Sequence, residues 1–151
     1  MAALLRAVLD DLHHSLRDRE LRVTLDVPPL PVHVLAEQND LTRVIVNLLT
    51  NALKFTPAGG SIAIVLRAGG EWLDLAIIDS GPGIPPAELE RVFDRFYRST
   101  AATRDGVPGT GLGLAIVREL VTEMHGSVVL ESDGSSGTTA RLRLPVGAPT
   151  A

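Results

Sequence analysis

The chain has 151 residues, of which 45% are hydrophobic, and its formal net charge at pH 7 is −4. This length suits one well-packed domain and is too short for two of ordinary size, so we treat residues 1–151 as a single domain. The mild negative charge and the dispersed basic residues argue against nucleic acid as a partner. The chain has no cysteine, which excludes disulfides and thiolate metal sites and permits a reducing compartment.

No apolar run in the sequence is long enough to span a bilayer. The first residues, 1–16, carry acids and histidines through their apolar pattern, which a signal peptide or a membrane anchor does not. We therefore expect a cytoplasmic fragment with no direct membrane contact.

The first predicted elements alternate between helix and strand. Residues 2–18 repeat apolar side chains at helical spacing, and residues 21–27 alternate like a half-buried strand. Prolines end this strand, and a second short strand is expected over 32–37. The stretch 40–57 then predicts a long helix, which Pro57 and the glycines after it bring to an end.

The middle of the chain predicts a hairpin and an irregular region. Strands are expected over 61–67 and 71–79, with a tight turn at 68–70. A short acidic helix is expected over 86–98. The stretch 99–108 has no apolar period and several small residues, which predicts a mobile segment.

The last part of the chain predicts one helix and two strands. The helix within 109–126 opens with glycines and ends at a Gly126 cap. The closing strands, 127–132 and 138–145, are joined by a glycine- and serine-rich turn at 133–137. This order predicts an α/β two-layer sandwich, with a mixed, mostly antiparallel sheet and helices on one face.

The helix predicted over 40–57 gathers its charged and amide side chains on one narrow strip. Asparagine is a mediocre helix former, and a buried asparagine must satisfy both its oxygen and its amide, which a ligand can do. A slim solvent-facing stripe explains the strip equally well for this helix alone. On a helical wheel the strip covers about 80° and comprises Asp40, Arg43, Asn47, Asn51 and Lys54, the only lysine of the chain.

A glycine-rich segment, GTGLGL at 109–114, lies directly before a predicted helix. Glycines let a backbone approach a ligand closely, and the first free N–H groups of a helix attract phosphate. A dinucleotide-binding fingerprint would need a strand immediately upstream, and here the upstream segment is a loop. The alternative is an extended helix cap, for which one glycine would be enough.

A carboxylate ends the strand predicted over 71–79, within DSGPGIP. A stiff turn capped by the aspartate is the commoner fate of such a segment. The functional interpretation is that Asp79 accepts hydrogen bonds from an amino group, while Gly81 and Gly83 leave space for a planar ring. An uncompensated carboxylate at the end of a buried strand is costly, which favours the ligand.

Four segments together resemble a known family. In chain order, NLLTNALKF, DSGPGIP, FDRFYR and GTGLGLAI resemble the four motifs of the ATP-binding catalytic domain of bacterial sensor histidine kinases, within the GHKL class of ATPases and kinases. The resemblance covers nearly the whole chain. It implies an α/β sandwich that binds Mg-ATP between helices and sheet, under a flexible lid.

The resemblance implies roles for the motif residues. Asn51 would coordinate Mg²⁺ through its amide oxygen, which suits an ion that prefers oxygen ligands. The catalytic group would be Asn47, which supports the phosphates, Lys54, which neutralises their charge, and Arg98, which reaches the γ-phosphate from the lid. The residues expected to bind the nucleotide are Asn47, Asn51, Lys54, Phe55, Asp79, Gly81, Gly83, Ile84, Tyr97, Arg98, Gly109, Thr110, Gly111, Leu112, Gly113, Leu114 and Thr138.

Within this set, Asp79 resembles the residue that takes the adenine amino group, and Thr138 would join it through a water. Phe55 would lie near the base. Two further aromatic residues, Phe93 and Phe96, would anchor the lid and help to dock the phosphoacceptor domain, unless they simply pack in the core.

The reaction is expected to be phosphoryl transfer. Relatives that hydrolyse ATP place a glutamate one helical turn before the magnesium asparagine; here Asn47 stands there, and an amide cannot take up a proton. The acceptor histidine of sensor kinases lies in a sequence like HExRTP, and His13, His14, His33 and His125 lack that context.

The expected partners are therefore a phosphoacceptor histidine domain of the parent protein, which we expect to be membrane-anchored, and a response regulator downstream. The domain is not expected to phosphorylate itself in isolation. Two alternatives remain, namely a non-enzymatic ATP-binding regulatory module and a GHKL-type ATPase.

Overall fold

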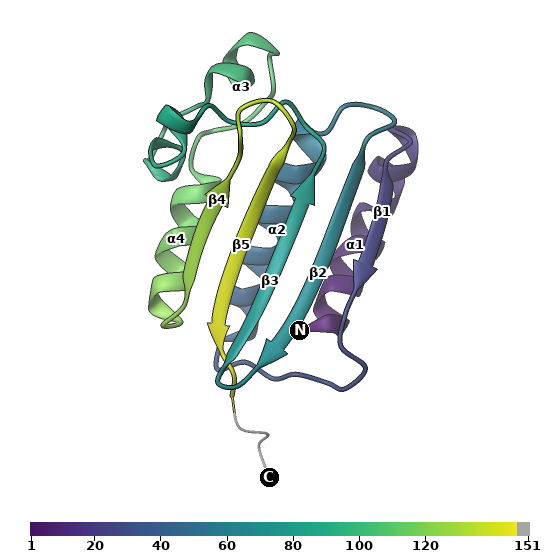
Figure 1. Cartoon of the computed structure of the whole chain (residues 1–151), viewed down its shortest axis with the longest axis vertical. Helices are drawn as coiled ribbons and strands as arrows, with labels where there is room; N and C mark the ends of the chain where they lie inside the picture. Colours follow the sequence, from purple (N-terminus) through teal and green to yellow (C-terminus); the bar gives the residue numbers. More distant parts are fainter. Residues whose placement is uncertain (148–151) are drawn as a thin grey trace.

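The computed structural model describes residues 1–147, which form one five-stranded sheet and the helices that cover it (Figure 1). The strand order is β1-β2-β3-β5-β4, and only the β1–β2 pair is parallel. No helix among these residues is long and apolar enough to cross a membrane. The elements are α1 (Ala2–Asp18), β1 (Arg22–Asp26), α2 (Gln38–Phe55), β2 (Ser61–Gly69), β3 (Trp72–Asp79), the 3₁₀ turns η1 (Pro86–Glu88) and η2 (Arg91–Phe93), α3 (Thr100–Arg104), α4 (Gly113–Glu123), β4 (Ser127–Glu131) and β5 (Thr138–Pro145).

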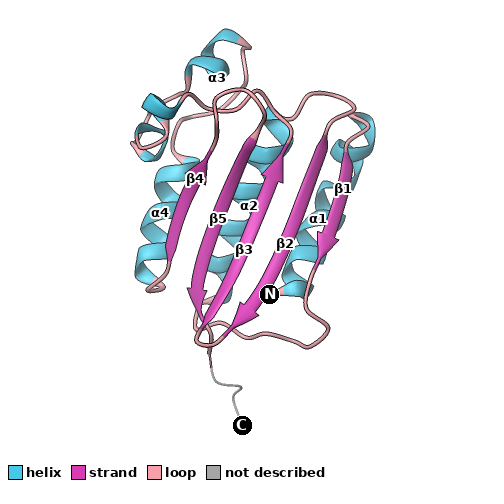
Figure 2. Cartoon of the chain, in the orientation of Figure 1, coloured by secondary structure: helices cyan, strands magenta, loops and turns pink. Residues whose placement is uncertain are grey.

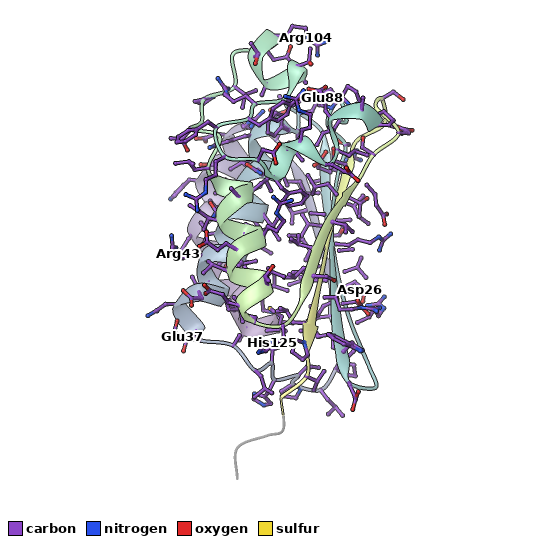
Figure 3. The ribbon with its side chains drawn as sticks, turned by 90° about the vertical axis from the view of Figure 1, so that its left-hand side faces the viewer. Asp26, Glu37, Arg43, Glu88, Arg104 and His125 are labelled. Carbon is purple, nitrogen blue, oxygen red and sulfur yellow. The ribbon has the colours of Figure 1, made fainter. Side chains whose placement is uncertain are left out.

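The long helices α1, α2 and α4 all lie on one face of the sheet, and the other face is open (Figure 3). Alternation within the strands sets this layering: in β2, Ile62, Ile64 and Leu66 are buried, whereas the residues between them are only half-buried. Asp26, which Figure 3 shows on the open side, pairs there with Arg67. The apolar side chains between the helices and the sheet are buried away from water, and this burial is the main force that stabilises the fold. The predicted two-layer sandwich is confirmed.

Helix α2 is the central helix, in contact with α1, α4 and β3. It begins and ends two residues earlier than predicted, because the Glu37 carboxylate accepts a hydrogen bond from the Asp40 N–H at 3.0 Å and caps its start. Its far end is held by Arg19, which donates to the carbonyl oxygens of Leu53 and, at 2.6 Å, Thr56. This guanidinium ties the end of α1 to the end of α2.

Two predicted elements are absent from the described structure. The stretch 32–37 is not a strand: it meets the sheet only at the end of β5, where the Leu35 N–H donates to the Pro145 carbonyl at 3.4 Å and Val34 forms an isolated bridge with Val146. The stretch 86–98 is not one helix but the turns η1 and η2, because the chain changes direction to bury Val92 and Phe93 in the core. His33 therefore lies in a loop, not on a strand.

Three smaller predictions also need correction. The β2–β3 turn is at 70–71, not 68–70, because Gly69 still pairs with Trp72. The stretch 99–108 is not wholly irregular, because it contains α3. The left-handed residue after α4 is His125, with φ 61°, and Gly126 is needed for a different reason: a Cβ there would lie 2.3 Å from the carbonyl oxygen of Arg143.

Candidate functional site

One end of the molecule contains a cavity of about 230 Å³. The C-terminal end of α2, the start of α4, the end of β3 and the start of β5 meet there, and the segment between β3 and α4, mostly loops and short helical turns, lies over it (Figures 1 and 2). The predicted site residues that line it are Asn47, Asn51, Lys54, Phe55, Asp79, Gly83, Ile84, Tyr97, Arg98, Gly109, Thr110, Gly111, Gly113, Leu114 and Thr138.

The polar strip of α2 is divided between two environments. Its C-terminal half, with Asn47, Asn51 and Lys54, lines the cavity. Its N-terminal half does not, and Arg43 projects from the helix away from the sheet (Figure 3). Only the first group is therefore placed where a ligand could meet it, and the second group fits the solvent-stripe interpretation. The rest of the helix is less buried than predicted, since Val46 is 37% exposed.

Asp79 uses one carboxylate oxygen to hold the protein backbone. Its Oδ1 accepts hydrogen bonds from the N–H groups of Gly81 at 2.9 Å and Thr138 at 3.2 Å. Burial raises the pKa of this carboxyl, and the two backbone hydrogen bonds oppose that rise. Within residues 1–147, no donor is bonded to the second oxygen, so it can accept from a ligand in the cavity. The turn interpretation is therefore confirmed for Oδ1, and the ligand interpretation stays a prediction for the other oxygen.

Gly81 does not line the cavity, contrary to its predicted place beside the base. A Cβ there would lie 2.7 Å from the carbonyl oxygen of Phe55, so this glycine allows the loop to pass closely behind the end of α2. Its N–H acts on the ligand site only through Asp79.

The β4–β5 turn supports the same wall, and sequence reasoning assigned it no role at the site. Ser132 Oγ accepts a hydrogen bond from the Ile84 N–H at 2.9 Å and donates to the Gly137 carbonyl at 2.7 Å. Gly137 has φ 104°, and a Cβ there would lie 2.0 Å from the carbonyl oxygen of Asp79. This turn therefore fixes both the aspartate and the loop after it.

The start of α4 faces the amide strip of α2. A Cβ at Gly113 would lie 3.4 Å from Asn47 Oδ1, and no described side chain caps the first turn of α4. The first N–H groups of an uncapped helix attract an anion. Leu112, predicted to give a backbone donor to the phosphates, is the N-cap residue and does not line the cavity. Its N–H donates to Thr110 Oγ1 at 3.3 Å.

The glycine-rich segment is bonded to the segment that carries the two phenylalanines. The Gly111 carbonyl accepts a hydrogen bond from the Phe96 N–H at 2.9 Å. Phe93 is buried, so the core interpretation suits it, whereas Phe96 is 72% exposed and has φ 65°. Arg98, the arginine expected in a lid, lines the cavity and donates to the carbonyl oxygen of Val107. Both residues belong to the segment 80–112 between β3 and α4, which lies over the cavity and is called the lid below.

Sequence reasoning missed the apolar and small residues of the wall. Four of them, Leu48, Thr50, Ala52 and Pro82, lie inside the motifs but were given no role there. Most of the others belong to core patterns that only the fold brings to the cavity. The missed residues are Leu48, Thr50, Ala52, Ile77, Pro82, Val92, Ser99, Ala102, Val107, Pro108, Leu130 and Ala140.

Comparison with known families gives a match over most of the chain. The family described as "Histidine kinase-, DNA gyrase B-, and HSP90-like ATPase" matches residues 36–148. The chain belongs to this family.

Similar members of the family are sensor histidine kinases, which confirms the resemblance drawn from the four motifs. The kinase/phosphatase MprB of Mycolicibacterium paratuberculosis is 39% identical over 131 residues, which are 86% of this chain and 24% of that protein. The sensor kinase WalK of Bacillus subtilis is 34% identical over 141 residues, 92% of this chain and 23% of that protein. The chain thus spans about a quarter of the length of these relatives.

Solved structures agree with the fold. A structure of the mycobacterial sensor histidine kinase MprB has a TM-score of 0.78 at 33% identity, and the match covers 93% of this chain and 95% of that one. Full-length ShkA, solved in complex with AMPPNP, has a TM-score of 0.85 at 28% identity; 99% of this chain and 31% of that chain are covered. The fold is therefore that of the catalytic ATP-binding domains of this family.

Proposed function

We propose that this domain binds Mg-ATP and donates the γ-phosphate to a histidine on a separate phosphoacceptor domain, in two-component signalling. The observation that supports this best is that one cavity joins the available oxygen of Asp79 to the asparagine strip and the uncapped start of α4. The arrangement suits a ligand with an amino-bearing ring at one end and phosphates at the other.

At the ring end, Asp79 would accept a hydrogen bond from the adenine amino group. Guanine carries a carbonyl oxygen at that position, which a carboxylate repels. The side chains of Ile77, Ile84 and Leu130 line the same cavity and offer apolar contact to the base. This combination favours adenine.

At the phosphate end, Asn51 would hold Mg²⁺ through its amide oxygen, with Asn47 beside it, and the ion would neutralise phosphate charge. Lys54 is exposed, and it forms no ion pair with any residue in 1–147, so its charge is free for a phosphate. Arg98 would exchange the Val107 carbonyl for the γ-phosphate.

In the transfer step, an imidazole nitrogen of the acceptor histidine would bond to the γ-phosphorus. The bond from that phosphorus to the bridging oxygen would break, and the electron pair would leave with ADP. Asn47 cannot act as a base for water, which favours transfer over hydrolysis. The exposed Phe96 would lie at the contact with the acceptor domain, and a response regulator would receive the phosphoryl group next. In the cell, we place this domain on the cytoplasmic side of a membrane-anchored parent.

The first test is calorimetric titration with AMPPNP, with and without Mg²⁺, on wild type and Asp79→Asn. We expect magnesium-dependent binding by wild type and about a hundredfold weaker binding by the variant, since a misplaced polar group in a buried site costs a few kcal/mol. The backbone N–H groups that now bond Oδ1 would hold the asparagine oxygen, so its NH₂ group would face the adenine amino group.

The matched control is Asp74→Asn, on the same strand but on the open face, where Asp74 pairs with Arg143 at 2.7 Å. This variant should bind as wild type does. A folded wild type that binds no nucleotide, or an Asp79→Asn variant that binds normally, would contradict the proposal. Binding without transfer to a phosphoacceptor domain would favour the regulatory module, and steady-state phosphate release would favour the ATPase.

A further inference from the structure

Glu88 joins three parts of the lid through one oxygen atom. Its Oε1 accepts hydrogen bonds from the Tyr97 hydroxyl at 2.5 Å, the Thr100 N–H at 2.9 Å and the Thr100 hydroxyl at 3.0 Å. In Figure 3, Glu88 lies next to the short helix that carries Arg104. The carboxylate thus connects η1 with the segment before α3 and with the first residue of α3.

The two residues held in this way stand on either side of Arg98. Tyr97 precedes it directly, and Thr100 follows it after Ser99. We propose that Glu88 is a positioning residue that fixes the backbone on both sides of Arg98, so that the guanidinium lies at the phosphate end of the cavity. The inference rests on the proposed function, since it concerns how the lid arginine meets the γ-phosphate.

Further contacts make this connection specific. The guanidinium of Arg91 lies over the Tyr97 ring, 4.7 Å from its centre. Ser99 Oγ accepts a hydrogen bond from the Ala102 N–H at 3.1 Å, so Glu88 and Ser99 together satisfy donors of the first turn of α3. The hydrogen bond from the Tyr97 hydroxyl contributes most to a pKa of Glu88 below its ordinary value, which is the direction expected for a carboxylate that accepts several hydrogen bonds.

A glutamate on a protein surface is usually hydrated and unpaired. Glu90, two residues further on, shows that state: it is exposed, and it forms no side-chain hydrogen bond with residues 1–147. Glu88 differs because all of its side-chain hydrogen bonds come from Tyr97 and Thr100, in the segment that carries Arg98. Glu90→Ala is therefore a matched control for Glu88→Ala.

The experiment compares AMPPNP with ADP, which lacks the γ-phosphate that Arg98 would contact. In Glu88→Ala, the affinity for AMPPNP should fall about tenfold, the size expected for loss of a charge-assisted hydrogen bond, while the affinity for ADP should change less than about twofold. Arg98→Ala should lose the preference for AMPPNP over ADP to the same extent. The double variant Glu88→Ala/Arg98→Ala should lose no more of this preference than Arg98→Ala alone. In Glu88→Gln, the amide oxygen still accepts hydrogen bonds, so most of the discrimination should return.

A second measurement needs no nucleotide. Amide hydrogen exchange over 97–104 should become faster in Glu88→Ala and stay unchanged in Glu90→Ala, while α4 keeps its protection in both. The inference would be overturned if Glu88→Ala lost affinity for AMPPNP and ADP equally, or if the losses of AMPPNP affinity in the two single variants added up in the double variant. Unchanged amide exchange over 97–104 in Glu88→Ala would also overturn it. A wild type that binds neither nucleotide would instead contradict the proposed function, and the exchange measurement would still decide whether Glu88 holds the lid.

Discussion

The two ends of the cavity are built differently. At the ring end, the wall consists of strand ends and the β4–β5 turn, and backbone groups fix Asp79 through Gly81 and Thr138. At the phosphate end, the covering segment consists of 3₁₀ turns, the five-residue helix α3 and loops, joined by side-chain hydrogen bonds such as those of Glu88 and Arg98. Backbone contacts in a sheet are hard to rearrange, whereas exposed side-chain contacts exchange readily with water.

This difference suits the two tasks of the proposed site. Selection of one base needs donors and acceptors held in a single geometry, which the sheet provides. A segment that closes over phosphates has to release and reform contacts, and short helices held by a few side chains can do so. The following changes test whether the ring end is rigid and the phosphate end adaptable.

Gly137→Ala should have the largest effect, because it disturbs the rigid end. The new Cβ would lie 2.0 Å from the Asp79 carbonyl oxygen at a backbone φ of 104°, which should reduce the free energy of unfolding by about 3 kcal/mol. Urea unfolding measures this loss. In the control Gly134→Ala, in the same turn with φ 88° but no atom nearer than 3.6 Å, only the backbone cost of about 1 kcal/mol is expected. Equal losses in both variants would contradict a rigid wall.

Gly111→Ala should have a smaller effect on stability, because it disturbs the adaptable end. A Cβ there would lie 2.8 Å from the backbone of Phe96, and φ is 75°, but the loop can shift. We expect a loss of about 1 kcal/mol in unfolding free energy and about tenfold weaker AMPPNP binding, as for one lost phosphate hydrogen bond. The control is Gly106→Ala, which lies outside the cavity wall, with φ 64° and nothing within 4 Å of an added Cβ. It should lose about 1 kcal/mol of unfolding free energy and bind AMPPNP as the wild type does. A loss as large as that of Gly137→Ala would remove the distinction between the two ends.

The pH dependence of Asp79 should give the smallest effect. Burial raises the pKa of this acid in the folded protein above its ordinary value of about 4, so folding disfavours the ionised form. The resulting cost is present above the folded pKa and disappears as the pH falls toward 4. Relative to Asp79→Asn, the wild type should therefore gain stability as the pH is lowered from 7 to 4, measured by urea unfolding at each pH. A relative loss would mean that the two backbone hydrogen bonds outweigh burial.

Sequence reasoning found the elements and motifs whose signal is local. The spacing of apolar residues in α1, α2 and the strands predicts the bounds of these elements to within a few residues. The four motifs contribute most of the polar residues of the cavity wall. It was wrong over 32–37 and 86–98. The first stretch finds a partner only at the end of β5, an inner strand, and the second turns to bury Val92 and Phe93. It also placed Gly81 against the base, although this glycine allows a close passage of the backbone and does not face the cavity.

By itself, the sequence determined the layered fold and the amide and carboxylate groups of the site, because apolar periodicity and residue chemistry are properties of short segments. Only the tertiary structure decided which half of the α2 strip meets the cavity, which oxygen of Asp79 is available, and that Glu88 joins η1 to α3. These facts depend on contacts between residues far apart in the chain, and no local pattern fixes the distance between such residues.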